Sequence, residues 1–128
     1  MESKGVLKMP HVVLEGKLEF RDIFDALLPI SIRDEKKILK TSTKYIDSEE
    51  NSILVEALAI EGGKKSSFIA LLGKREDGLV IRIYPELNIE KTDGIKNILA
   101  EIAKQLIQKF PNLKIGKTNL QDFLPING

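Results

Sequence analysis

The stretch DGIKNILAEIAKQLIQKF, residues 93–110, is the most regularly patterned part of this chain. Its apolar residues recur every three or four positions, and a helix turns about 100° per residue, so they form one stripe along a helix. The stripe contains Ile95, Ile98, Leu99, Ile102, Ala103, Leu106 and Phe110. We therefore expect an amphipathic helix over 93–110 that packs on other apolar segments.

Several segments before this helix have the pattern of strands. Residues 12–20 alternate apolar and charged side chains, which predicts a half-buried strand. Four later segments also read as strands, separated by polar or glycine-containing turns: 38–46, 52–61, 66–75 and 79–84. Asp77-Gly78 is a strong hairpin signal, because both central positions of such a turn favour positive φ. Strands joined by short turns predict an antiparallel meander.

A short helix is expected between the first two strands. Five apolar residues there have helical spacing: Phe20, Ile23, Phe24, Leu27 and Leu28. Pro29 ends this helix, because the residue before a proline avoids the α region. We interpret residues 30–37 as a loop or one further helical turn. Near the end of the chain, Thr118 and Gln121 have the spacing of a capping box, which predicts a terminal helical turn.

These elements predict an α+β fold, an antiparallel sheet of about five strands with two helices on one face. The order is β-α-β-β-β-β-α plus a C-terminal tail, with residues 1–10 as a flexible N-terminus and 11–128 as a single domain. Over about residues 12–110 this topology resembles one repeat of the TATA-binding protein, a curved sheet with helices on its convex side. It is also similar to a reduced helix-grip fold of START-like lipid-binding proteins. These resemblances concern topology and imply no functional residue.

Composition narrows the class of protein. The chain has 128 residues, of which 42% are hydrophobic and 30% charged, as in soluble globular proteins. Its formal net charge of +1 provides no global attraction for nucleic acid or an anionic membrane. Cysteine is absent, which excludes disulfides, thiol catalysis and cysteine-rich zinc sites. We expect a cytoplasmic protein, and the excess of Ile, Lys and Glu is typical of thermophiles or of AT-rich genomes.

No motif predicts catalysis, a metal or a cofactor. Gly116-Lys117-Thr118 has the form of the end of a phosphate-binding loop, but Pro111 stands where that loop requires glycine. His11 is the only histidine, so nitrogen ligands for a metal are scarce. We predict no catalytic residue, no metal site and no cofactor. An enzymatic role is less favoured than a binding role, although carboxylate chemistry leaves it open.

Surplus hydrophobicity is the main functional signal. The segments 52–61 and 66–75 are apolar on both faces, whereas a sheet with one face in water alternates cleanly. The apolar arc of the helix at 93–110 is also wider than one sheet requires. These features favour a non-enzymatic binding or assembly module, a homodimer or a subunit of a complex. Either the C-terminal tail or a partner chain would cover the helix, with these residues in the contact: Ile107, Leu120, Phe123 and Leu124.

Two alternative functions follow from other residues. An apolar, lipid-like small molecule would fit a cavity between the sheet and the helix at 93–110. Its lining would be Ile53, Val55, Phe68, Ala70, Ile81, Ile98 and Ile102. Nucleic acid would bind a basic face of the sheet. That face would carry Lys40, Lys44, Lys74, Arg75 and Arg82, with Lys40 and Lys44 on the same side of one strand. A lysine-rich strand also protects a sheet edge from aggregation, which is the competing interpretation.

Overall fold

The structure, a computed structural model, describes residues 9–85 and 89–125. Its centre is an antiparallel sheet of seven strands in the order β2-β3-β4-β5-β6-β1-β7. The strands are β1 (His11–Glu15), β2 (Ser31–Arg33), β3 (Lys37–Ile46), β4 (Ser52–Glu61), β5 (Lys64–Arg75), β6 (Gly78–Ile83) and β7 (Lys114–Thr118). The helices are α1 (Phe20–Ala26) and α2 (Asp93–Lys109), with a 3-10 turn, η2 (Gln121–Phe123).

The predicted α+β class and the antiparallel sheet are confirmed, but the predicted number of about five strands is wrong. One additional strand, β2, lies in the segment interpreted as a loop or helical turn. The Asp34 carboxylate accepts hydrogen bonds from the backbone N–H groups of Lys36 and Lys37, and this turn allows β2 to pair with β3. The other, β7, lies in the expected tail and pairs antiparallel with β1. The N-terminal residues 1–8, expected to be flexible, lie outside the described residues.

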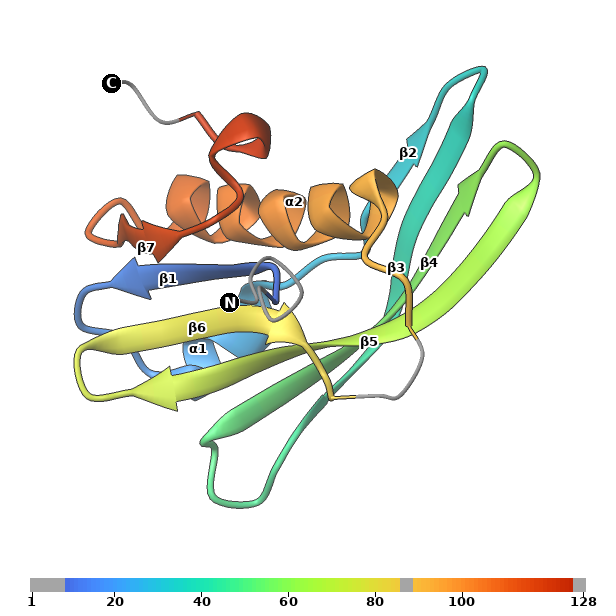
Figure 1. Cartoon of the computed structure of the whole chain (residues 1–128). Helices are drawn as coiled ribbons and strands as arrows, with labels where there is room; N and C mark the ends of the chain where they lie inside the picture. Colours follow the sequence, from blue (N-terminus) through green and yellow to red (C-terminus); the bar gives the residue numbers. More distant parts are fainter. Residues whose placement is uncertain (1–8, 86–88, 126–128) are drawn as a thin grey trace, which may run out of the picture.

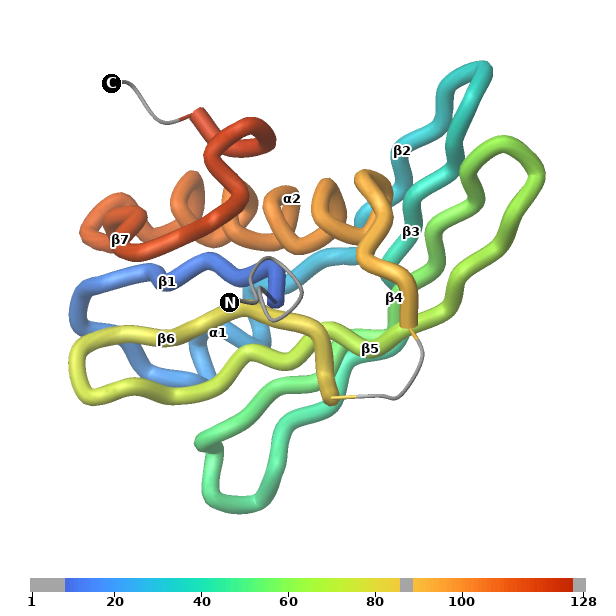
Figure 2. Tube along the Cα trace, in the orientation of Figure 1, coloured from blue at the N-terminus to red at the C-terminus, as the bar shows by residue number. Residues whose placement is uncertain are grey.

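Both helices pack on one face of the sheet, which we call the inner face. Figure 1 shows the sheet curled around α2, which contacts β1 and β6 on one side and β3 and β4 on the other. The shorter α1 contacts β3, β4 and α2. Figure 2 traces the long β3–β4 and β4–β5 hairpins, which extend past the rest of the sheet.

The predicted stripe of α2 forms the centre of the core. Its buried apolar residues are Ile95, Ile98, Leu99, Ala100, Ile102, Ala103 and Leu106. They meet the inner-face side chains of the central strands, including Ile53, Leu72 and Ile81, each with no exposed surface. Burial of this apolar area is the main stabilising term of the fold.

The C-terminal tail covers the flank of α2 that the sheet leaves open. After β7 the chain turns back, η2 contacts α2, and Leu120 and Leu124 are buried in the core. A terminal helical turn is present as the 3-10 turn η2, but its N-cap is Leu120 without a side-chain cap, so Thr118 and Gln121 do not form the predicted capping box. The Gln121 side chain instead donates to the backbone carbonyl of Thr118. The C-terminal tail of the chain therefore covers much of the wide apolar arc of α2.

The N-terminus of α2 is held by a carboxylate from a distant strand. Glu61, the last residue of β4, accepts a hydrogen bond from the backbone N–H of Gly94 at 2.9 Å and another from the Thr92 hydroxyl at 2.6 Å. Negative charge is favourable at this end of a helix, where backbone N–H groups lack partners. A Cβ atom on Gly94 would lie 2.6 Å from the Glu61 carboxyl carbon. Residue 94 therefore has to be glycine for the carboxylate to approach.

We predict opposite effects of Gly94→Ala in two backgrounds. In the native chain Gly94→Ala lowers the free energy of unfolding, because the new methyl group displaces the Glu61 carboxylate. Glu61→Ala alone lowers the free energy of unfolding by about 1–3 kcal/mol. In the Glu61→Ala background, Gly94→Ala stabilises by up to about 1 kcal/mol, because alanine is the better helix former. Urea denaturation at one protein concentration measures the free energy of unfolding of the native chain, the two single variants and the double variant. Equal effects of Gly94→Ala in both backgrounds would contradict this coupling.

Candidate functional site

The face of the sheet turned away from the helices, the outer face, is defined by strand register. Directly opposed residues of antiparallel strands point to the same side, and successive residues alternate. Leu54 lies opposite Leu71, and Lys40 lies opposite Leu58. Their neighbours in sequence, such as Val55, point inward and are buried. The outer face of β3, β4 and β5 is therefore known residue by residue.

Aliphatic side chains form a continuous group on this outer face, which we call the outer patch. Its members are Ile38, Leu54, Leu58, Ile60, Ile69 and Leu71. Each is half-buried, and neither α1 nor α2 covers them, because both helices pack on the inner face. The central strands β4 and β5 are thus apolar on both faces, and the helices bury only one of them.

A hollow of about 500 Å³ lies within the outer face, between β3, β4 and β5. Lys40 and Lys65 line it from the side of Leu58 and Ile60, and Glu56 lines it from the opposite side. None of these three charged side chains forms an ion pair with another residue in the described part of the chain. The hollow therefore carries opposite charges on its two sides.

Tyr45 accompanies Glu56 on the outer face. Its side chain is exposed, and its hydroxyl donates a hydrogen bond to the Glu56 carboxylate. This hydrogen bond, together with the nearby negative charge, raises the pKa of Tyr45 above its ordinary value, because ionisation would place two anions side by side. The two residues form one polar unit beside the outer patch.

The residues predicted for nucleic-acid binding do not share one face. Lys40 lies on the outer face, but a register shift between Thr41 and Lys44 turns Lys44 inward. The expectation that Lys40 and Lys44 lie on the same side of β3 is therefore wrong. Arg75 and Arg82 line a shallow pocket at the other end of the outer face, together with Lys74. Lys74 also lines a separate cleft described below.

Lys44 instead supports α1. Its amine donates hydrogen bonds to the backbone carbonyls of Phe24 at 2.6 Å and Leu27 at 2.9 Å, at the C-terminal end of the helix. It also lies 4.6 Å from the centre of the Phe24 ring, a cation–π distance. These contacts account for Lys44 without a ligand.

The residues predicted to line an apolar cavity come together in the core. All seven are at most 5% exposed and pack between the sheet and the helices: Ile53, Val55, Phe68, Ala70, Ile81, Ile98 and Ile102. The pockets that Val55 and Phe68 reach open at the surface. Among the residues predicted for interaction, Ile107, Phe123 and Leu124 line a further surface pocket of about 490 Å³ between α2 and η2. Leu120 is buried in the core.

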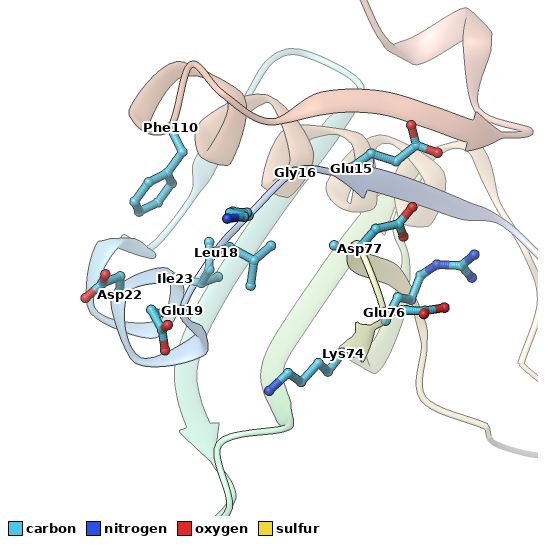
Figure 3. Close-up of a pocket in the computed structure, with 13 residues that line it drawn as sticks. Glu15, Gly16, Leu18, Glu19, Asp22, Ile23, Lys74, Glu76, Asp77 and Phe110 are labelled. Atoms are coloured by element: carbon cyan, nitrogen blue, oxygen red, sulfur yellow. The ribbon is translucent and has the colours of Figure 1, made fainter.

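A cleft of about 740 Å³ lies where β1, α1, the β5–β6 turn and the end of α2 meet. Figure 3 shows Leu18 and Ile23 at its centre, Glu19 and Asp22 at the start of α1 on one side, and Lys74 with Asp77 on the other. Phe110 closes the end nearest α2. The rim of this cleft mixes five acidic side chains with three basic ones. Sequence reasoning missed it, because segments distant in sequence form it.

No helix within residues 9–85 and 89–125 is long and apolar enough to cross a membrane. In the same ranges, no group of three or more histidine or acidic side chains is placed to hold a metal ion.

Comparisons with known proteins found no matching family model, no matching curated protein and no matching solved structure.

We predict that Lys44 has a structural role. Lys44→Met removes both hydrogen bonds to α1 and lowers the free energy of unfolding by about 1–3 kcal/mol. Lys117→Met, which changes an exposed lysine of β7, serves as the control and changes it by less than about 0.5 kcal/mol. Urea denaturation at one protein concentration compares them, and equal stabilities would contradict the role assigned to Lys44.

We also predict that Glu56→Gln lowers the pKa of Tyr45. The substitution removes the carboxylate that disfavours the phenolate, so ionisation begins at lower pH. The chain has two tyrosines and no tryptophan, so phenolate absorbance in a Tyr84→Phe background reports Tyr45 alone. An unchanged titration curve would show that Tyr45 and Glu56 do not interact in solution.

Proposed function

We propose that this chain is an assembly module that self-associates through its outer face. The continuous outer patch carries the proposal, because soluble monomers seldom leave large apolar patches open and such patches mark interaction surfaces. Leu58 lies near its centre, with Leu54 preceding it and Ile60 following it on the same side of β4. A second copy presents the same patch, so face-to-face pairing would cover both at once.

The size of the outer face suits a dimer. Strands β3 and β4 have ten residues each and lie beside β5 and β6 in the sheet. At about 3.3 Å per residue and 4.8 Å per strand, these four strands present about 600 Å². Two such faces would bury at most about 1,200 Å² in total, the lower end of the range for stable interfaces.

The chemistry of the face favours a protein surface over the alternatives. Nucleic acid would need several cations for its phosphates, and the outer face carries Lys40 and Lys65 near one end and Arg75 and Arg82 near the other. Aliphatic residues and Glu56 lie between these two pairs. Tyr45 and Tyr84 are exposed and would allow bases to stack, so binding of single-stranded nucleic acid is the competing outcome. The apolar-ligand alternative is less supported, since the side chains predicted to line its cavity pack in the core.

The curl of the sheet supports the helix-grip resemblance more than the TATA-binding protein resemblance. In the latter the helices lie on the convex side, whereas here α2 lies within the curl (Figure 1). On this view the outer face is the convex side of the sheet and remains available to a partner. The resemblance concerns architecture and supplies no ligand.

The proposal predicts that Leu58→Glu dissociates the dimer. A carboxylate at the centre of the covered patch would have to lose its hydration, so the dissociation constant rises by about a hundredfold or more. Sedimentation equilibrium of the native chain and the variant over a wide concentration range measures this effect. Circular dichroism shows whether the variant remains folded.

Leu28→Glu is the matched control. Leu28 is 65% exposed and follows α1, away from the outer face, so the same substitution there leaves the dimer intact. A native chain that stays monomeric at every concentration overturns the proposal. If that monomer also retains a single-stranded oligonucleotide at low salt, and Lys40→Ala weakens the binding, the nucleic-acid alternative replaces it.

A further inference from the structure

We propose that, in the dimer, Glu56 of each copy pairs with Lys40 and Lys65 of the other. This inference rests on the proposed self-association and specifies its register. The three side chains border one hollow of the outer face, with the carboxylate on one side and the two amines on the other. Such an arrangement is complementary to itself, because a two-fold axis through the hollow brings opposite charges together.

The register of the strands gives the positions of these charges. Across the sheet, Lys40, Leu58 and Ser67 form one row, since Leu58 lies opposite both Lys40 and Ser67. Glu56 and Ile69 form the next row, about 7 Å further along β4, because two residues separate side chains of the same face. Lys65, opposite Ile60, belongs to the row on the far side of Leu58.

A two-fold axis that runs across the strands between these two rows exchanges them. It places Glu56 of one copy over Leu58 of the other. From there Lys40 is one strand away, about 5 Å to the side, and Lys65 is one strand and one row away. The flexible side chains of both lysines reach that far. The same axis places Leu54 of each copy over Ile60 of the other, so part of the two outer patches also meets.

The energetic reason for this register is the cost of burying a charge alone. In the described part of the chain Glu56 has the Tyr45 hydroxyl as its partner, and neither lysine has an acidic partner. Covering the hollow removes water from all three charged groups, which is costly unless they find opposite charges. Pairing across the interface meets that cost and disfavours other registers, in which like charges would meet.

Charge reversal tests the pairing directly. Lys40→Glu and Glu56→Lys should each raise the dissociation constant of the dimer by about tenfold or more, and the double variant should restore it to within about threefold of the native value. Lys117→Glu, on β7, makes the same change of charge as Lys40→Glu and should leave the constant unchanged. Sedimentation equilibrium measures the dissociation constant of all five chains. A double variant that associates no more tightly than the two single variants overturns the pairing.

A second test does not depend on charge. The chain has no cysteine, so Lys40→Cys and Glu56→Cys each introduce a single thiol. When the two variants are mixed, a short bis-maleimide should join position 40 of one copy to position 56 of the other. A Lys117→Cys chain mixed with Glu56→Cys should give no such product.

The outcomes separate this inference from the proposed function. If Leu58→Glu dissociates the dimer but the charge variants and the 40–56 cross-link behave like their controls, the outer faces associate in another register and the pairing is wrong. If the native chain is monomeric, both proposals are wrong.

Discussion

The burial of α2 is the constraint on which the rest of this structure depends. A helix with an apolar arc wider than one flat sheet can cover needs apolar partners on several sides, and the sheet meets this need by curling around it. The tail after β7 covers the remaining flank through Leu120 and Leu124. Glu61 of β4 fixes the N-terminal end of the helix, which orients α2 within the curl.

The same arrangement explains why the outer face is the candidate site. The helices and the tail supply apolar cover to the inner face, and the side chains of β4 and β5 that point outward receive none from α1 or α2. The helices therefore form a layer on one face of the sheet. We propose that a second copy of the chain covers the other face.

Strongly periodic segments could be predicted from the sequence, and local departures from periodicity could not. The helix at 93–110 and the central strands follow from their repeats, as does the apolar character of both faces of β4 and β5. Strand β2 is too short to show a period, and its turn depends on the Asp34 carboxylate. The irregularity between Thr41 and Lys44 reverses the side of the sheet to which Lys44 points, and no residue type in this stretch predicts it. The charged hollow depends on the pairing of three strands, which periodicity does not give.

The position of β1 has a consequence for how the chain folds during its synthesis. β1 lies between β6 and β7, so its first strand partner is made only after four other strands have left the ribosome. The β2–β6 meander can form earlier, because each of its strands pairs with the next one along the chain. Until α2 and β7 are synthesised, the meander lacks the helix that packs on its inner face, and the sheet lacks its last strand. Completion of the fold therefore waits for the C-terminal third of the chain, and the nascent meander is the species that a chaperone would meet.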